Sequence, residues 1–363
     1  MAFFLKTYNM LQNKKIFISP LDWGLGHTTR CIPIIQSLLE LNANVYVGVN
    51  EEQKKLLELE NLNVEYISFK GYAITYPSSS KMAWKMSVQI PKILTRIKQE
   101  KEELEALIQK HNFDLVISDN RFGLYAKNVP SVYITHQINI QAPLGIDKLL
   151  YHFHKQFINK FTQCWIPDYK DENLNLAGRL SHGKLEDNYY YIGTLSRFKQ
   201  AIVTNDKEYI YLAVISGPEP QRSLFENYVL DLFSSSNKKC AVLGGKPLEE
   251  RIEKYNNIDY FSHLDTEDLQ ELMRISEKVI ARPGYSTIMD LSILQKPVLF
   301  IPTPNQTEQE YLARYLKQKY NIDYCLQEEI QDLAFRKEYN TLPLFQNEYL
   351  TKTIRHLIQK ILS

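Results

Sequence analysis

The chain has 363 residues, of which 44% are hydrophobic and 23% are charged, a composition typical of globular proteins. Its length suits two domains of roughly 150–200 residues each. Lysine and arginine (43) nearly balance aspartate and glutamate (42), and the net charge of +1 argues against a nucleic-acid partner attracted by overall charge.

Cysteine usage and hydropathy indicate the compartment. The four cysteines lie far apart and form no C-x-x-C pair: Cys31, Cys164, Cys240 and Cys325. We therefore expect neither disulfides nor zinc, and a reducing cytoplasm is favoured. No apolar run approaches the roughly 20 residues of a membrane-spanning helix, and residues 1–15 lack the features of a secretory signal. Peripheral contact with the inner face of the membrane stays open.

The first half of the chain alternates predicted strands with predicted helices, which favours a parallel sheet with crossover helices. The apolar strand-like runs are residues 15–20, 45–49, 64–69, 114–118 and 131–135. Helices are predicted over residues 31–41, which have one apolar face, and over residues 82–111. We expect a doubly wound N-terminal domain over residues 14–195.

After a loop-rich stretch at residues 167–189, a second alternating pattern begins. Its strands are predicted at residues 209–215, 240–243, 258–261, 278–281 and 298–301, with a helix at 222–233. We predict a second domain over residues 196–340 and a terminal helix over 341–363 that packs back on the first domain. The expected fold class is α/β, with two Rossmann-like doubly wound domains facing a central cleft.

A glycine turn followed by histidine comes directly after the first strand, as Gly24-Leu25-Gly26-His27. Glycines let the backbone approach a ligand, and the next helix begins at the cleft. A dinucleotide fingerprint would need a third glycine near Thr29 and an acidic residue ending the second strand, so NAD binding is weakly supported. His27 suits a general base, or it simply closes the turn.

The segment SGPEPQR follows the strongest strand of the second half. Ser216 and Gly217 place a small side chain and backbone N–H donors at a helix start, which suits a diphosphate, and Arg222 adds positive charge. An ordinary strand-to-helix turn is the alternative.

Residues 281–315 carry the densest set of polar candidates. The predicted turn at Gly284 to Thr287, with Ser286 and the preceding Arg282, would bring N–H, hydroxyl and guanidinium donors onto phosphate. Asp290 lies one helical turn beyond Thr287 on the same face and suits a ribose diol. Its alternative role is helix-dipole stabilisation, about 0.3–1 kcal/mol.

Glu308 and Gln309 open the last predicted helix of the second domain and are candidates for sugar hydroxyls, with exposed helix starts as the alternative. No metal or resident cofactor is expected. His152 and His154 point to different sides of a helix and cannot share a metal, and the chain has no Asp-x-Asp pair. The hydrolase elbow and the P-loop motif are absent as well.

Together these loops resemble the two-domain GT-B glycosyltransferases. The nearest likeness is to the family-28 group, which includes the UDP-N-acetylglucosamine transferase of lipid II synthesis and the diacylglycerol glycosyltransferases. The likeness covers roughly residues 15–315. The family's glycine loop with histidine, its Ser-Gly turn, its Arg-x-Gly-x-x-Thr-x-x-acid stretch and its donor-sugar glutamine match Gly24 to His27, Ser216-Gly217, Arg282, Gly284, Thr287, Asp290 and Gln309.

The chain also departs from the family pattern. SGPEPQR replaces a Ser-Gln-Gly run, Glu310 stands where the family has a second glutamine, and residues 71–85 show no match. The donor is therefore better supported than the acceptor.

The resemblance implies a metal-independent transferase that takes a nucleotide-sugar donor, UDP-linked as in UDP-N-acetylglucosamine. It favours inversion at the anomeric carbon, with retention as the alternative. Uracil would lie near His263 and Leu264, and ribose on Asp290. His27 would activate the acceptor hydroxyl or contact the donor phosphate, and Asp119, which follows the 114–118 strand, is a second candidate base. A lipid-linked or envelope glycan precursor is the expected acceptor, with a small molecule as the alternative; the oligomeric state is open.

Two other functions stay open. A UDP-sugar 2-epimerase-like enzyme has the same architecture and would need several carboxylates in the cleft. A catalytically inactive nucleotide-sugar-binding subunit would have a cleft without a usable base. His27 and Asp119 within about 10 Å of the donor pocket would count against the inactive subunit.

Overall fold

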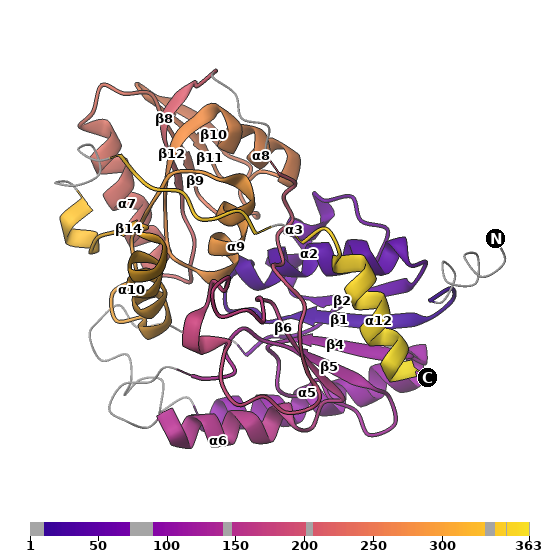
Figure 1. The fold of residues 1–363 in the computed structure, drawn as a ribbon. Helices are drawn as coiled ribbons and strands as arrows, with labels where there is room; N and C mark the ends of the chain where they lie inside the picture. The colour runs from indigo at the N-terminus through magenta and orange to yellow at the C-terminus, as the bar shows by residue number, and fades with distance from the viewer. Residues whose placement is uncertain are drawn as a thin grey trace, which may run out of the picture.

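The computed structural model of the protein describes residues 11–72, 90–140, 147–200, 206–330, 338–345 and 347–362. Residues 82–89 of the predicted long helix, and most of residues 71–85, lie outside these ranges. The predicted α/β architecture is confirmed within them: two sheets lie side by side, each flanked by helices (Figure 1).

The N-terminal half is built on a parallel sheet with the order β3-β2-β1-β4-β5-β6-β7. Its strands are β1 (Lys15–Pro20), β2 (Asn44–Val49), β3 (Glu65–Ser68), β4 (Leu115–Asp119), β5 (Ser131–Ile134), β6 (Gln163–Ile166) and β7 (Tyr189–Tyr191). The strand order reverses between β1 and β4. Loops that leave the carboxyl ends of two such strands diverge and form the ligand crevice of this kind of fold.

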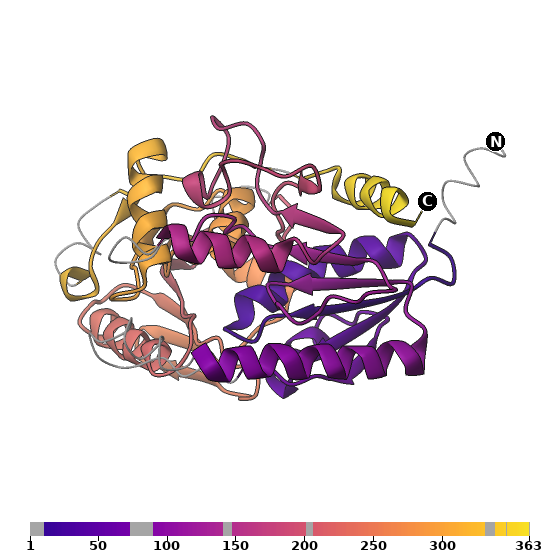
Figure 2. The same cartoon turned by 90° about the horizontal axis from the view of Figure 1, so that it is seen from below.

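Helices cover both faces of this sheet: α2 (Leu25–Glu40), α3 (Glu51–Glu58), α5 (Ile90–His111) and α6 (Asp147–Ile158). Alternate residues of β1 face opposite layers. Ile16 and Ile18 belong to the core cluster that contains α2, whereas Phe17 packs with Leu104 of α5. Figure 2 shows the long α5, in purple, along the N-terminal sheet. Burial on both faces explains why these strands are continuous apolar runs.

The C-terminal sheet has the order β10-β11-β9-β8-β12-β13-β14, with β10 antiparallel and all other pairs parallel. Its strands are β8 (Tyr209–Val214), β9 (Cys240–Leu243), β10 (Ile252–Tyr255), β11 (Ile258–Phe261), β12 (Ser276–Ala281), β13 (Val298–Phe300) and β14 (Asp323–Tyr324). The helices are α7 (Gln221–Ser234), α8 (Thr266–Ile275), α9 (Tyr285–Leu294) and α10 (Thr307–Tyr320). Here the order reverses between β8 and β12.

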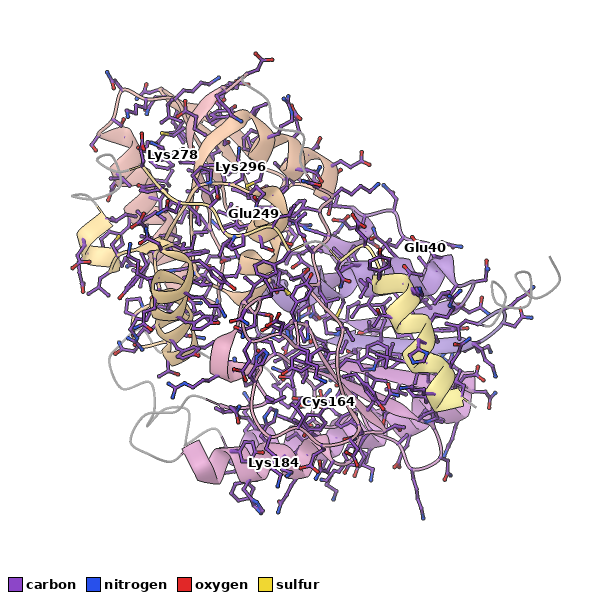
Figure 3. The ribbon with its side chains drawn as sticks, in the orientation of Figure 1. Glu40, Cys164, Lys184, Glu249, Lys278 and Lys296 are labelled. Carbon is purple, nitrogen blue, oxygen red and sulfur yellow. The ribbon has the colours of Figure 1, made fainter. Side chains whose placement is uncertain are left out.

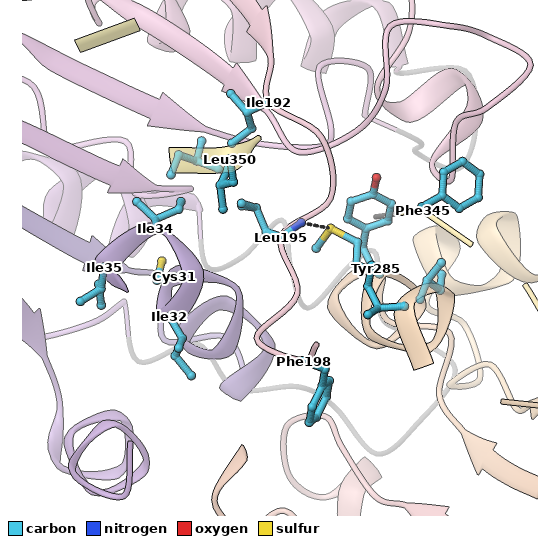
Figure 4. Packing of buried hydrophobic residues seen from close by; sticks show 14 of the residues in the cluster. Cys31, Ile32, Ile34, Ile35, Ile192, Leu195, Phe198, Tyr285, Phe345 and Leu350 are labelled. Atoms are coloured by element: carbon cyan, nitrogen blue, oxygen red, sulfur yellow. Dashed lines mark hydrogen bonds between the residues drawn. The ribbon is translucent and has the colours of Figure 1, made fainter. Parts of the chain in front are cut away.

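The two halves share a hydrophobic core around α2 and α9, which contact each other. Figure 4 shows side chains of both helices around the connecting segment, where the backbone N–H of Leu195 donates to the sulfur of Met289 at 3.2 Å. Phe198 of the same segment packs into this cluster. The position of one half relative to the other is therefore fixed by side-chain packing as well as by the connecting segment.

The last helix, α12 (Leu350–Leu362), returns to the N-terminal half (Figure 1). It packs on α2, and the Thr351 hydroxyl contacts Ser37 Oγ at 3.0 Å and Glu40 Oε2 at 2.8 Å. All four cysteines are buried and free; Figure 3 labels Cys164 of β6. None of the described helices is long and apolar enough to cross a membrane.

Candidate active site

Two glycine turns open equivalent positions in the two halves. Gly24 follows β1 with φ +111°, Gly217 follows β8 with φ +109°, and around both the place of a Cβ atom is empty to 4 Å. Such φ values strain other residues, and the open space leaves the backbone accessible to a ligand. Both turns lie where their sheet reverses its strand order, which is where the sequence places the cleft.

Helix starts around this region differ in how they are capped. The side chains of Asn50, Asp265 and Gln306 cap α3, α8 and α10 by accepting a backbone N–H. In contrast, α2 begins at Gly24 and α9 at Gly284 without any side-chain cap. Their first-turn amides are therefore left for another acceptor, and an anion is the acceptor that a helix start favours.

His27 and Asp119 form a hydrogen-bonded pair at the edge of the N-terminal sheet. His27 lies in the first turn of α2 and Asp119 ends β4; His27 Nδ1 is 2.9 Å from Asp119 Oδ2. The His27 side chain is 17% exposed and that of Asp119 is 0% exposed, so only the imidazole can reach a substrate. Asp119 is therefore better placed to orient the His27 ring than to act as the base itself.

Arg30 binds the same carboxylate from one turn further along α2. Its Nε lies 3.0 Å from both oxygens of Asp119. Burial by itself would raise the pKa of Asp119, but Arg30 and His27 outweigh it and hold that pKa below its usual value. Burial and then Arg30 lower the pKa of His27, against the opposing effect of Asp119. Near neutral pH the imidazole is uncharged and the carboxylate is ionised.

The two contacts at His27 Nδ1 correspond to different tautomers. Asp119 Oδ2, at 2.9 Å, accepts a proton from Nδ1, whereas Arg30 Nη2, at 2.8 Å, donates to an unprotonated Nδ1. In the tautomer that is bonded to Asp119, Nδ1 carries the proton. Nε2 is then an unprotonated acceptor, as a general base requires.

The polar chain continues into the C-terminal half through His136, which follows β5. His136 Nδ1 lies 3.3 Å from Arg30 Nη1, and its Nε2 lies 2.7 Å from Glu308 Oε1 in the first turn of α10. The ring of Tyr285 stacks on His136 with centroids 4.2 Å apart and 8° between planes. Burial would raise the pKa of Glu308, but His136 outweighs it and the net shift is downward.

Of the residues in this polar chain, the sequence predicted His27, Asp119 and Glu308 as site residues but not Arg30 or His136. Two signals were available. His136 follows a predicted buried strand at the cleft edge, and Arg30 stands three residues after His27, on the same helical face.

Gly26 and Ser286 join the two halves directly. The Ser286 hydroxyl donates to the Gly26 carbonyl at 2.7 Å, so the start of α9 lies beside the residue that precedes His27. Thr287, in the same turn of α9, is half-buried, and the place of a Cβ on Gly284 meets only Thr287 Oγ1 at 3.9 Å. The predicted diphosphate loop is therefore adjacent to the candidate base.

Asp290 faces the segment that connects the halves. Its Oδ1 accepts from the Ser196 hydroxyl at 2.6 Å, and burial raises its pKa to about 6 against the opposing charge of Arg197. His263, after β11, is close to the same arginine. Burial lowers the pKa of His263 to about 4, and neither ring nitrogen has a hydrogen-bond partner among the described residues. A half-buried imidazole without partners, next to Leu264, suits contact with a ligand.

The two arginines predicted for the diphosphate are held by the protein instead. Arg282 is 1% exposed, donates to the carbonyls of Ile301 and Pro302 at 2.9 and 3.0 Å, and lies over the Phe225 ring. It fixes the loop after β13 and does not project into the cleft, because those carbonyls pair with its guanidinium in the interior.

Arg222 is paired with Glu219, through Nη2 at 2.7 Å, and with the Gly245 carbonyl. Glu219 also accepts from the backbone of Ser223 at 3.3 Å, so the start of α7 is partly occupied. In the turn at Ser216 and Gly217, the group that stays accessible to a ligand is therefore the backbone of Gly217. Gln309 uses its carbonyl oxygen to accept from Thr303 N at 2.8 Å, which orients its amide at the start of α10.

A metal site is not apparent in the described part of the chain, where no group of three or more His, Cys, Asp or Glu side chains has suitable geometry.

Comparison with known proteins finds a family match within the C-terminal half. Residues 236–354 match the glycosyltransferase family 28 C-terminal domain. The chain is 28% identical to an uncharacterized glycosyltransferase of Methanosarcina acetivorans, over 95% of this chain and 98% of that protein. It is 24% identical to a Francisella tularensis UDP-N-acetylglucosamine--N-acetylmuramyl-(pentapeptide) pyrophosphoryl-undecaprenol N-acetylglucosamine transferase, over 88% of this chain and 86% of that protein.

Solved structures with the same fold include the glycotransferase of kitacinnamycin, with a TM-score of 0.64, 11% identity, and coverage of 97% of this chain and 95% of that one. The UDP-GlcNAc 2-epimerase of Methanocaldococcus jannaschii has a TM-score of 0.55 at 12% identity, covering 96% and 100%. At such identities the likeness establishes the fold alone. Taken together, residues 236–354 match the glycosyltransferase family 28 C-terminal domain, and the chain is a glycosyltransferase with the GT-B fold.

Proposed function

We propose that this glycosyltransferase moves a sugar from a UDP-linked donor, UDP-N-acetylglucosamine, to an acceptor hydroxyl, with inversion and without a metal. The observation that carries the proposal is the His27 and Asp119 pair, 2.9 Å apart, beside the uncapped start of α9. The name of the Francisella relative, a UDP-N-acetylglucosamine-dependent transferase, supports the choice of donor.

In the proposed reaction, Nε2 of His27 accepts the proton of the acceptor hydroxyl while that oxygen attacks the anomeric carbon. The bond from that carbon to the diphosphate breaks, and UDP leaves with the electron pair. Asp119 stabilises the imidazolium that forms, which is the role of a carboxylate behind a histidine base. The free amides of the α9 start stabilise the negative charge on the leaving diphosphate.

The donor would lie across the C-terminal half. We propose that the base contacts His263 and Leu264, and that the ribose displaces the Ser196 hydroxyl from Asp290. The diphosphate would contact the backbone at Gly217 and Gly284, with the hydroxyls of Ser216, Ser286 and Thr287 around it. Glu308 and Gln309, at the start of α10, would face the sugar. The buried Arg282 and the paired Arg222 act by holding the surrounding loops.

A lipid-linked or envelope glycan precursor is the proposed acceptor, in keeping with the pyrophosphoryl-undecaprenol acceptor for which the Francisella relative is named. Such an acceptor would bring the protein to the inner face of a membrane by peripheral contact.

The test is a mass-spectrometric screen of nucleotide sugars against acceptor extracts, with wild type and His27→Gln in parallel. Transfer from UDP-N-acetylglucosamine that depends on His27 is expected. Formation of the 2-epimer from the donor alone would instead indicate an epimerase-like enzyme. Binding of UDP without any turnover, over the whole panel, would indicate a nucleotide-sugar-binding subunit.

A further inference from the structure

A hollow lies outside the donor loops, between the segment 168–183 and α10. Its volume is about 870 Å³, and it is open to solvent. Figure 1 shows the short helix η2 (Gly178–Leu180) of that segment, in crimson, beside α10. Among its lining residues are Asn139, Tyr151, Arg179, His182, Tyr315 and Lys319. Both halves of the protein thus contribute to its wall.

The loop that forms one wall is organised by a single buried carboxylate. Asp168 is 0% exposed and accepts from Leu176 N at 3.0 Å, Ala177 N at 3.1 Å and Ser181 Oγ at 2.6 Å. The Asn139 amide donates to the carbonyls of Arg179 at 2.9 Å and of His182 at 2.5 Å. The wall is therefore preformed, although the sequence here shows no periodicity.

Tyrosines of α10 attach this loop to the C-terminal half. The backbone N–H of Arg179 donates to the Tyr311 hydroxyl at 2.8 Å, and the Tyr320 hydroxyl donates to the Asn175 carbonyl at 2.8 Å. Tyr315 donates to the Asn175 side chain. A cavity held between two domains in this way changes shape when they move, as substrate sites of two-domain enzymes do.

Two cations in this wall have unused capacity for an anion, and one histidine has an unpaired ring nitrogen. Arg179 has no ion-pair partner in the described residues, and its guanidinium lies over the Tyr311 ring at 5.8 Å. Lys319 contacts the carbonyl of Glu172 and no carboxylate within that part of the chain. The Ser181 hydroxyl donates to Asp168, so His182 Nδ1 donates to Ser181 Oγ, and Nε2, which has no hydrogen-bond partner in the described residues, is an acceptor suited to a sugar hydroxyl. The Glu172 carboxylate offsets only one of the two cationic charges.

The hollow is connected to the active site through both of its walls. Asn139 follows His136 by three residues, and Tyr315 follows Glu308 by seven residues of the same helix. At 1.5 Å per helical residue, the second spacing is about 10 Å. His136 and Glu308 contact each other, so the cavity begins on the order of 10 Å from the cross-domain end of the polar chain that contains His27.

We infer that this hollow binds the part of the acceptor remote from the reacting hydroxyl, and that the acceptor is a sugar bearing a phosphate. Arg179 and Lys319 bind the phosphate, His182 and Asn139 line the path of the sugar hydroxyls, and the Tyr315 ring offers an apolar face. The inference rests on the proposed function and specifies the acceptor, which the donor loops leave undefined.

The experiment is calorimetry with N-acetylglucosamine 1-phosphate and with N-acetylglucosamine, at saturating UDP so that the donor's diphosphate site is filled. We expect the phosphorylated probe alone to bind measurably, and Arg179→Gln or Lys319→Gln to weaken it about tenfold, as for loss of a charge-assisted hydrogen bond. Arg179→Lys, which keeps the charge, should retain most of the affinity.

Matched controls are Arg314→Gln, an exposed residue of α10, and Lys170→Gln, an exposed residue of the same loop; both should bind the probe as the wild type does. Equal affinity for the two probes, or equal loss in the control variants, would overturn the inference. UDP affinity, measured in every variant, separates the two proposals. Failure of the wild type to bind UDP overturns the proposed function, whereas intact UDP binding without phosphate-dependent probe binding overturns only the acceptor inference.

Discussion

Replacing Asp119 by asparagine separates the charge of the buried carboxylate from its shape. The amide oxygen can still accept a hydrogen bond, but the negative charge that faces His27 and Arg30 is lost. Arg30 is 2% exposed, so the variant leaves a buried guanidinium without its anion. Breaking one side of such a pair costs about 3–5 kcal/mol of unfolding free energy.

The catalytic effect should be larger than the effect of lost stability. Without the carboxylate, His27 loses the partner that assigns its Nδ1 proton and stabilises its imidazolium. A positioned general base contributes about 10²–10⁴ in rate, so we expect kcat of Asp119→Asn to fall within that range. UDP affinity should not change, since Asp119 lies in the N-terminal half and contacts none of the proposed donor residues.

The assay is UDP release at saturating donor and acceptor, with urea unfolding of the same preparations. Glu226→Gln is the matched control, because Glu226 is a 5% exposed carboxylate paired with Lys246 at 2.9 Å in the C-terminal half. It should lose stability and keep its rate. The double variant of His27→Gln with Asp119→Asn should be no slower than His27→Gln alone. A rate within threefold of wild type for Asp119→Asn, or an equal loss for Glu226→Gln, would refute the role of the pair.

Three further outcomes are expected. Asp290→Ala should weaken UDP binding in calorimetry about tenfold or more, as loss of a charged hydrogen-bond acceptor does. Because the Asp290 carboxyl of the ligand-free protein has a pKa of about 6, the UDP affinity of the wild type should rise as the pH increases through 6, and Asp290→Asn should abolish that rise. Glu308→Ala removes the acceptor for His136, so kcat should fall about tenfold with UDP affinity unchanged, and an unaltered kcat would exclude the cross-domain contact from catalysis. His154 is 4% exposed and its pKa is lowered to about 4, so on acidification this histidine is protonated in the unfolded chain before it is protonated in the folded protein. The unfolding free energy should therefore fall by about 3 kcal/mol between pH 6.5 and 4. In urea titrations of His154→Leu, the unfolding free energy should fall less over the same pH range.

The elements most accurately predicted are those with a strong local pattern. Residues 15–20 form β1 as expected, and the predicted helix at 222–233 is α7. Strands β6, β7, β10 and β14 were not predicted. They are short, and β10 is a largely exposed edge strand, so its composition has no apolar run. The central strands are recognisable in the sequence because burial on both faces makes them continuous apolar runs.

Motif spacing also located most of the cleft. Residues that end β1, β4, β8 and β12 were predicted to line it because parallel strands place their carboxyl ends at one edge. The motif did not reveal that Arg282 points inward, since its carbonyl partners follow another strand, about 20 residues later. From the sequence, Asp119 was a candidate base, whereas its full burial and its contact with His27 favour an orienting role.

The sequence by itself determined the alternation of strands and helices, the two glycine turns and the likeness of the donor half to family 28, because those features depend on residues close together in the chain. Tertiary structure decided which polar groups meet. His27 and Asp119 are 92 residues apart, and His136 and Glu308 are 172 apart and in different halves. Contacts of that kind depend on how two separately wound sheets pack around α2 and α9, and local periodicity carries no information about that packing.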